Sequence, residues 1–259
     1  MVNVIVDPPE HEIEGVKYEV ALKIADMLKK GRRYFGVSAA GLSHQAFNPD
    51  YESKGVTPSL AKIGLEGERD TTTILKKWME DKPNAVLVDS VHIRGYGKEE
   101  VDPETGMIEG GDTDHVLLIG SEVILIDSKR WKKKANYTVG DNGEALRSGK
   151  LFPGSHIHMQ QAIYMWLDFL YEDASLTGIV HINAEETVVF RNRNWYTKPF
   201  RLVELDRFLE LLDEKYDMID DYDKTHINST LVSQVAVNAI KPFDPYSRVF
   251  HQDALRTFK

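Results

Sequence analysis

Hydrophobic positions recur at helical spacing in three parts of the chain. The first stripe runs from Val16 to Lys30 and is followed by a glycine, Gly31. The second lies between residues 64 and 79, and the third between residues 155 and 171. Apolar residues three and four positions apart share one side of a helix, so each stripe predicts an amphipathic helix with one face on a core.

Short apolar runs rich in strand-forming residues separate these helices. Residues 85–93, Ala-Val-Leu-Val-Asp-Ser-Val-His-Ile, predict a buried strand. Alternation of such strands with amphipathic helices predicts an α/β core. The other expected elements are strands at 176–183 and 186–190, helices at 202–216 and 229–240, loops with short elements at 32–58, a loop at 95–111, and a mobile loop beside the candidate site at 135–154.

Two apolar runs between residues 110 and 131 predict a β-hairpin. Val116–Ile119 and Val123–Ile126 are rich in strand formers, and the Gly-Ser pair at residues 120–121 lies between them. Such a pair suits a two-residue turn whose first central residue has a positive φ. The turn then places Ile119 opposite Glu122, which fixes the register of the two strands.

The same register brings acidic residues together on one face of the hairpin. Counting back along both strands sets Asp114 opposite Asp127, and Asp112 opposite Lys129. Two carboxylates directly across a sheet repel each other, so a cation is expected between them. The cation is either Lys129 itself or a divalent metal bound through oxygen. Alternatively, Asp112 and Lys129 form a simple cross-strand ion pair and Asp114 is solvated.

Composition narrows the class of protein. With 259 residues and 42% hydrophobic content, we expect one soluble domain with elaborations. No apolar run approaches the roughly 20 residues of a membrane span, and the N-terminus lacks the basic start of a signal peptide, so we expect a cytoplasmic protein without a membrane partner. Cysteine is absent, so any metal must bind through oxygen or imidazole.

Charge is distributed unevenly along the chain. The net charge of −9 argues against coating nucleic acid by bulk electrostatics. From Lys129 to Lys134, however, every residue except Trp131 is a lysine or arginine. Basic charge beside metal-binding carboxylates is what a phosphodiester-cleaving site needs, so Arg130, Lys132 and Lys133 are candidate substrate contacts. The alternative is a solvated, charged turn.

Four short motifs occur in a particular order between about residues 61 and 170. They are Gly64-x-x-Gly67-Glu68, Asp114-His115 before an apolar strand, Ile126-Asp-Ser-Lys-Arg-Trp131, and Gln160-x-x-x-Tyr164. The first three resemble the nuclease-related domain (NERD) branch of the PD-(D/E)xK nuclease superfamily. The fourth resembles the motif downstream of the catalytic lysine in RecB-type nucleases. This chain has Asp where many relatives have Glu before the lysine.

The resemblance implies a mixed central sheet flanked by helices, that is, a restriction-endonuclease-like core with N- and C-terminal helical elaborations. We expect a single nuclease domain over residues 1–259, with its catalytic core at 61–190. Residues 1–60 would form an N-terminal helix and loop elaboration, and residues 191–259 a helical C-terminal one.

The resemblance also implies roles for individual residues. Asp114 and Asp127 would bind Mg²⁺ or Mn²⁺, with Glu68 and the carbonyl oxygen of Ser128 as further ligands. Lys129 would orient or help to deprotonate the attacking water and stabilise charge on phosphorus. A plain preference for acidic residues near a helix N-terminus also explains Glu68. Gln160 and Tyr164 would position the site or the DNA backbone; a polar helix face explains them equally well.

We therefore expect a divalent-metal-dependent nuclease that hydrolyses DNA with a metal-activated water. The alternatives are an inactive nucleic-acid-binding or assembly module of the same fold, and an RNA nuclease. A zinc site at His156-x-His158 lacks a third ligand at obvious spacing. A Ser-His-Asp hydrolase lacks the nucleophile-elbow signature. Self-association, a recombination or repair partner protein, and the choice between exo and endo cleavage stay open.

Overall fold

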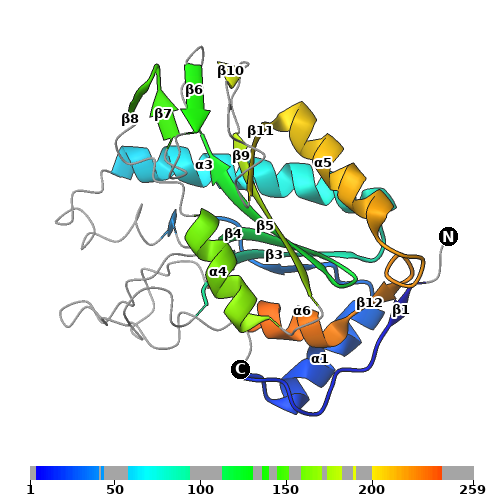
Figure 1. The fold of residues 1–259 in the computed structure, drawn as a ribbon. Coiled ribbons are helices and arrows are strands. Elements are labelled where there is room, and N and C mark those ends of the chain that lie inside the picture. The colour runs from blue at the N-terminus through cyan, green and yellow to red at the C-terminus, as the bar shows by residue number, and fades with distance from the viewer. Residues whose placement is uncertain are drawn as a thin grey trace, which may run out of the picture.

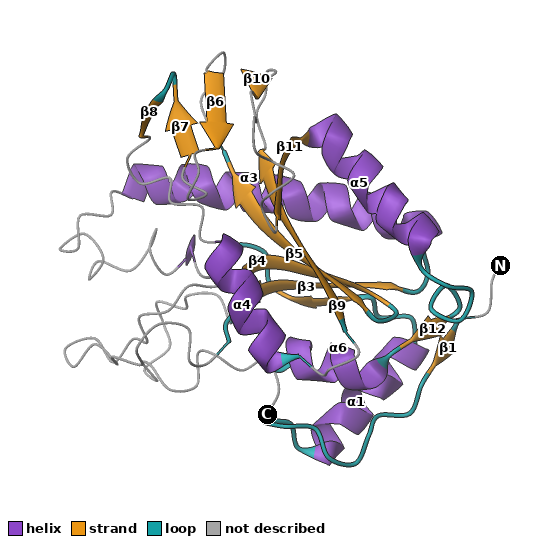
Figure 2. Cartoon of the chain, in the orientation of Figure 1, coloured by secondary structure: helices purple, strands orange, loops and turns teal. Residues whose placement is uncertain are grey.

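A mixed β-sheet lies between two layers of helices (Figures 1 and 2). The computed structural model describes residues 4–40, 42–43, 58–93, 113–130, 136–139, 145–151, 159–170, 174–182, 189–190 and 200–240. The chain is thus an α/β protein, as the sequence predicts.

The central sheet contains, among the described residues, six strands in the order β11-β9-β5-β4-β3-β2. Strands β3, β4 and β5 are antiparallel to one another, whereas β9 is parallel to β5, β11 to β9, and β2 to β3. The strands are β2 (Tyr34–Gly36), β3 (Ala85–Val91), β4 (Thr113–Ile119), β5 (Glu122–Lys129), β9 (Ser175–Ile182) and β11 (Phe200–Glu204). Strands β2 and β11 extend the sheet beyond the expected core of residues 61–190.

Each face of this sheet has its own helices (Figure 2). Each face also has its own apolar cluster. Leu75 of α3 and Phe208 of α5 pack with Leu87 and Leu117 on one face. Leu28 of α1 and neighbouring residues of α4 and α6 pack on the other face, where Val116 and Leu125 point. The helices are α1 (Tyr18–Lys29), α3 (Pro58–Trp78), which continues into the 3-10 turn η2 (Met79–Asp81), α4 (Met159–Phe169), α5 (Leu205–Met218) and α6 (Ser229–Ala236).

A smaller sheet corrects the prediction of a loop at residues 135–154. Strands β6 (Asn136–Val139), β7 (Ala145–Arg147) and β8 (Lys150–Leu151) lie in this segment, and β10 (Val189–Phe190) joins them in the order β10-β6-β7-β8. Ser148 and Gly149, with φ values of 52° and 77°, make the turn between β7 and β8. The strands are too short for their apolar alternation to stand out from the polar turns around them.

Two predicted helix boundaries were also wrong. The helix expected from residue 64 begins earlier, at Pro58, and the helix expected from residue 202 begins at Leu205, because residues 200–204 pair with β9 as a strand. Both N- and C-terminal regions meet where β1 (Ile5–Val6) pairs with β12 (His226–Ile227). None of the helices in the described ranges is long and apolar enough to cross a membrane. The predicted loop at 95–111 lies outside the described residues.

The hairpin between β4 and β5 has the predicted turn and register. Gly120 has a φ of 60°, and Ile119 pairs with Glu122. A carboxylate from far along the chain fixes this turn: Asp223 Oδ2 accepts hydrogen bonds from the backbone N–H of Ser121 at 3.1 Å and from its hydroxyl at 2.8 Å. A Cβ on Gly120 would overlap the Asp223 side chain, so both backbone conformation and space require glycine here.

We expect Gly120→Ala to lower the free energy of unfolding by about 3 kcal/mol, since strain from the positive φ adds to the clash with Asp223. Gly31→Ala is the matched control. Its φ is also positive, at 88°, but the space around it is open, so we expect a loss of only about 1 kcal/mol. Urea unfolding measures both values, and equal losses would show that Asp223 does not constrain the turn.

Candidate functional site

The predicted acidic pair lies where β4 and β5 end together. The observed pairing runs from Ile119 with Glu122 back to His115 with Ile126, and one further step sets Asp114 beside Asp127. Alternation along the strands points both carboxylates, and Lys129, to the face that carries Val116 and Leu125. The predicted register is therefore confirmed.

Lys129 is the cation among these carboxylates. Its Nζ lies 2.5 Å from Asp127 Oδ1, and its side chain is 30% exposed. Burial lowers the pKa of Lys129, but the charges of Asp127, Asp114 and Glu68 raise it and prevail, so the net shift is upward. The ammonium thus stays charged, and three carboxylates from different elements act on it at once.

Glu68 reaches this cluster from the middle of α3. The helix begins at Pro58, so a preference for acidic residues in the first turn does not explain Glu68. Its side chain is 3% exposed, and a glutamate is rarely so buried unless a partner compensates its charge. Gly67 allows the approach, since a Cβ there would lie 3.0 Å from Cβ of Arg130 at the end of β5.

Arg130 ties β5 to the same helix. Its Nη1 donates to Glu66 Oε2 at 3.0 Å and lies 3.5 Å from Asp70 Oδ2. Both acids are exposed, whereas the Arg130 side chain is 24% exposed. In this arrangement Arg130 holds the end of β5 against α3, and a role in substrate binding stays a prediction.

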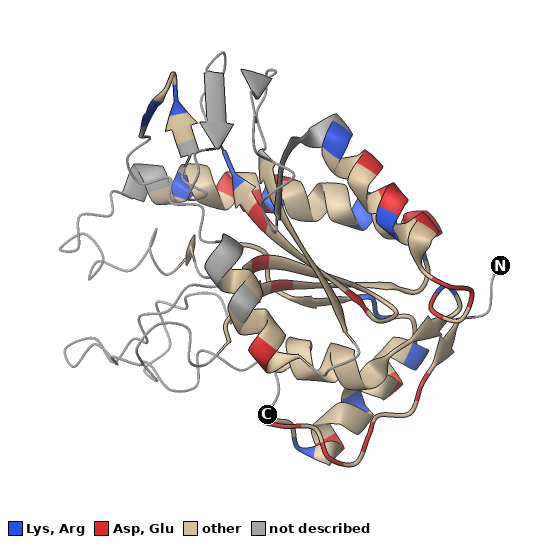
Figure 3. Ribbon diagram, in the orientation of Figure 1, with Lys and Arg blue, Asp and Glu red and all other residues tan. Residues whose placement is uncertain are grey.

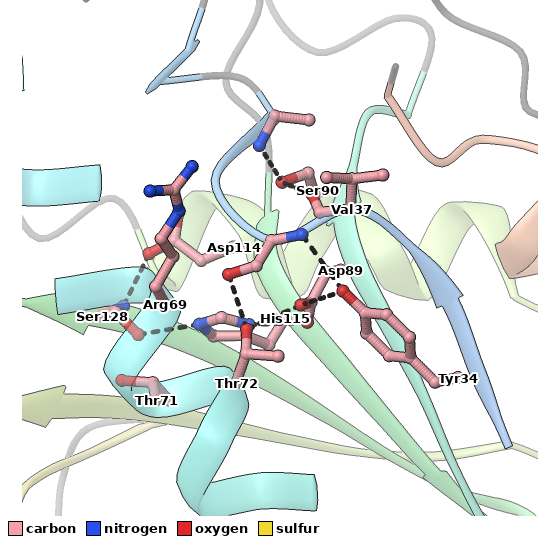
Figure 4. A network of polar contacts seen from close by, with 12 residues as sticks. Tyr34, Val37, Arg69, Thr71, Thr72, Asp89, Ser90, Asp114, His115 and Ser128 are labelled. Carbon is pink, nitrogen blue, oxygen red and sulfur yellow. Dashed lines mark hydrogen bonds and ion pairs between the residues drawn. The ribbon is translucent and has the colours of Figure 1, made fainter. Parts of the chain in front are cut away.

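A buried chain of hydrogen bonds, which sequence reasoning missed, lies on the opposite face of the sheet (Figure 4). His115 Nδ1 lies 2.8 Å from Asp89 Oδ1, and His115 Nε2 lies 2.9 Å from Ser128 Oγ. Asp89 and His115 are fully buried. The signal that could have revealed the chain is the polar Asp89-Ser90 pair inside the otherwise apolar strand β3.

Two further hydroxyl groups stabilise the Asp89 carboxylate. Thr72 Oγ1 donates to Asp89 Oδ2 at 2.6 Å, and the Tyr34 hydroxyl donates to the same oxygen at 3.0 Å. Burial lowers the pKa of His115, but the charge of Asp89 and its hydrogen bond raise it and prevail. Asp89 of β3 and His115 of β4 are therefore fixed by hydrogen bonds from α3 and β2 as well as by each other.

The buried chain connects directly to the candidate site through Ser128. The backbone N–H of Ser128 donates to Asp114 Oδ2 at 2.6 Å (Figure 4). Ser128 thus contacts His115 through its hydroxyl on one face and Asp114 through its backbone. The position of the Asp114 carboxylate therefore depends on Ser128, although the side chain of Ser128 lies on the other face of the sheet.

The backbone of β3 is distorted at the position opposite Asp114. Ser90 has a φ of 53°, and the pairing with β4 passes from Asp89 directly to Val91. Ser90 Oγ accepts from the N–H of Ala40 at 2.9 Å and donates to the carbonyl of Val37 at 3.1 Å, which holds this conformation. Residues with such backbone strain are concentrated at functional sites.

Asp89, His115 and Ser128 have the connectivity of a Ser-His-Asp triad. The serine nucleophile of such a triad must reach a substrate, yet Ser128 is 7% exposed and lies within a strand under α3. It is also not on the strained strand-to-helix turn that presents the serine of an α/β-hydrolase. The arrangement therefore serves to hold Ser128 in place and does not support nucleophilic catalysis.

The donor chemistry of the cluster suits a hard cation, but the arrangement is not closed around one. Carboxylate oxygens from Glu68, Asp114 and Asp127 are the ligand type that Mg²⁺ and Mn²⁺ prefer. Among the described residues, however, no group of three or more His, Asp or Glu side chains is arranged to hold a metal ion. As described, the ammonium of Lys129 is the cation paired with Asp127.

Several predicted site residues are not placed by the structure. Residues 160 and 164 fall on α4, the predicted helix, but the side chains of Gln160 and Tyr164 lie outside the described part of the chain. The same holds entirely for Lys132, Lys133, Asp112, His156 and His158.

The fold and the site together define an α/β protein with a carboxylate and lysine cluster at one end of a mixed sheet. Comparison with known proteins adds no family: no protein-family model, no curated protein and no solved structure matches the chain.

A second buried histidine, His181 of β9, supports a test of pH dependence. Thr71 Oγ1 donates to the carbonyl of Gly67, so His181 Nδ1 carries the proton in its 3.0 Å contact with Thr71. His181 Nε2 has no hydrogen-bond partner among the described residues, and the ring stacks on Phe208 at 4.3 Å. Burial, followed by the charge of His115, lowers the pKa of His181 to about 4.

We expect this histidine to destabilise the fold as pH falls. The unfolded chain takes up a proton on residue 181 near pH 6.5 and the folded chain only near pH 4, so stability drops across that window by about 3 kcal/mol. Urea unfolding of His181→Gln between pH 4 and pH 7 should show a shallower decline than the wild type. His11→Gln, at an exposed position, is the matched control, and an unchanged slope in His181→Gln would contradict the assignment.

Proposed function

We propose that the protein is a divalent-metal-dependent nuclease that hydrolyses DNA phosphodiester bonds. The observation that carries the proposal is the contact of Lys129 with Asp127 at the end of the β4–β5 hairpin, beside Asp114, which the backbone N–H of Ser128 holds. The charges of Glu68 and Asp114 act on Lys129 as well, and carboxylate oxygens are the ligands that a divalent cation prefers.

The order of elements supports a restriction-endonuclease-like core. An acid-bearing helix, α3, precedes the hairpin β4–β5, and α4 with residues 160 and 164 follows it. Strand β9 then returns parallel to β5 and pairs along its whole length. These are the places in which the resemblance to PD-(D/E)xK and RecB-type nucleases puts the corresponding motifs.

In the proposed reaction, Asp114, Asp127, Glu68 and the carbonyl oxygen of Ser128 would hold Mg²⁺ or Mn²⁺. The ion would supply a hydroxide at neutral pH, because binding to the metal lowers the pKa of water. Water adds to phosphorus, the bond to the leaving oxygen breaks, and a proton passes to that oxygen. Lys129, which stays charged, stabilises the negative charge on the phosphate oxygens and is less suited to remove a proton.

Charge placement supports a polyanionic substrate at this end of the molecule. Lys129 is the last residue of β5 and Arg130 follows it, and Arg147 and Lys150 flank the turn between β7 and β8. Figure 3 shows basic residues at the end of β5 and in this small sheet. Acidic residues are prominent in the loop before β12, which contains Asp220, Asp221 and Asp223. Lys129 and Arg130 are paired with Asp127, Glu66 and Asp70, so Arg147 and Lys150 are the residues that would bind phosphates locally on this chain of net charge −9.

We expect the protein to cut linear, circular or single-stranded DNA in the presence of Mg²⁺ or Mn²⁺, and EDTA to abolish cutting. Lys129→Ala and Asp114→Asn should each reduce the rate at least about 100-fold, because the first removes a positive charge that stabilises the reacting phosphate and the second a charged ligand of the metal ion. Gel assays on end-labelled and circular substrates measure the rate and separate exo from endo cleavage.

Lys23→Ala, at an exposed lysine on α1, is the matched control and should cut at the wild-type rate. Cutting that survives Lys129→Ala would point to a contaminating nuclease or to a different site. The same assay with RNA tests an RNA nuclease, which cuts RNA in preference to DNA.

A second candidate function is an inactive nucleic-acid-binding or assembly module of the same fold. The short contact between Lys129 and Asp127, and the lack of any metal-holding group among the described carboxylates, favour it. Such a module would bind DNA in a gel-shift assay without cutting any substrate at any metal concentration.

A further inference from the structure

The buried chain of hydrogen bonds ends on one residue of the candidate metal site. Ser128 receives the contact from His115 at its hydroxyl, and its backbone N–H donates to Asp114. Both contacts lie in the described and buried part of β5. The conformation of Ser128 therefore links two faces of the sheet.

We propose that Asp89 and His115 are positioning residues that fix Ser128, and through it the carboxylate of Asp114, in the orientation that binds a divalent metal ion. The inference rests on the proposed function and deepens it. Neither residue contacts substrate or metal; both act through Ser128.

The hydrogen bonds of His115 fix the orientation of its imidazole ring. Asp89 Oδ1 accepts only, so Nδ1 of His115 carries a proton toward it, and Nε2 is left to contact Ser128 Oγ. Thr72 and Tyr34 hold the other oxygen of Asp89. A carboxylate fixed from two further elements leaves the ring one orientation, and the ring fixes the serine hydroxyl.

A fixed Ser128 controls the positions of two candidate metal ligands. Its N–H sets Asp114 Oδ2 at 2.6 Å, and its carbonyl oxygen is itself a candidate ligand. A shift of this one residue would displace both the Asp114 carboxylate and the Ser128 carbonyl oxygen. The two neighbours of Ser128 in sequence are the candidate ligand Asp127 and the candidate catalytic residue Lys129, so a shift of its backbone reaches the whole set.

The buried pair of Asp89 and His115 adds little to the stability of the fold. The positions around it on the same face, Leu87, Leu117 and Ile126, are apolar and fully buried. A buried ion pair contributes no more to stability than well-packed apolar residues of similar volume. The positive φ of Ser90 opposite Asp114 adds backbone strain at the same level of the sheet. Positioning a ligand accounts for the buried ion pair, whereas packing does not.

The test measures Mn²⁺ binding to the full-length protein by calorimetry, without DNA, so that catalysis does not enter. Ser128→Ala removes only the hydroxyl and keeps the backbone N–H. We expect it to weaken Mn²⁺ binding about 10-fold, the usual effect of removing an outer partner of a metal ligand. The electron paramagnetic resonance spectrum of bound Mn²⁺ should change as well.

Two substitutions at His115 test the orientation directly. The amide of His115→Gln reaches the position of Nε2 and retains a contact with Ser128, whereas His115→Asn reaches only the position of Nδ1. Among variants that stay folded by circular dichroism, Mn²⁺ binding should be weaker in His115→Asn than in His115→Gln.

Thr177→Val is the matched control, because it deletes a part-buried hydrogen bond to Glu122 at the far end of the same strand pair. It should lower the melting temperature without changing Mn²⁺ affinity. If the wild type binds Mn²⁺ and Ser128→Ala binds it equally well, the positioning role is wrong while the proposed function stands. If the wild type binds neither Mn²⁺ nor Mg²⁺, the proposed metal site is wrong, and the inference falls with it.

Discussion

Repulsion among carboxylates is the constraint on which the functional end of this protein depends. Asp114 and Asp127 are brought together by hairpin register, and Glu68 is brought in by a helix that glycine allows to approach closely. Such a set is unfavourable without positive charge, and Lys129 supplies it within the same strand. Burial distinguishes this cluster from the ordinary ion pairs of the surface, such as Lys30 with Asp26, because Glu68 and Asp114 are both buried.

The two faces of the hairpin carry different sets of polar residues. One face presents the carboxylates and the lysine, while the other carries a buried Asp89–His115 pair in contact with Ser128. Because neighbouring residues in a strand point to opposite faces, Ser128 lies between Asp127 and Lys129 in sequence but reaches the other side of the sheet. His115 therefore contacts the central residue of the segment Asp127-Ser128-Lys129 from the opposite face of the sheet.

The sequence was informative where local rules decide the structure. The turn at residues 120–121 determined the register of the hairpin, and helical spacing located α1, α3 and α4. Prediction from the sequence failed where the structure depends on contacts between residues that are far apart in the chain. Asp89 and His115 are 26 residues apart and meet only because β3 pairs with β4. Residues 200–204 became a strand because β9 offers an open edge, and the short strands β6 to β8 carry no long apolar run.

The contact of Asp223 with the hairpin turn also bears on the order of folding. Ser121 and Asp223 are 102 residues apart, so during synthesis the hairpin emerges long before the carboxylate that holds its turn. A hairpin that slips by one residue would move every acid on it to the wrong face. The contact therefore acts as a late check on strand alignment, and the site reaches its final geometry only after Asp223 has left the ribosome.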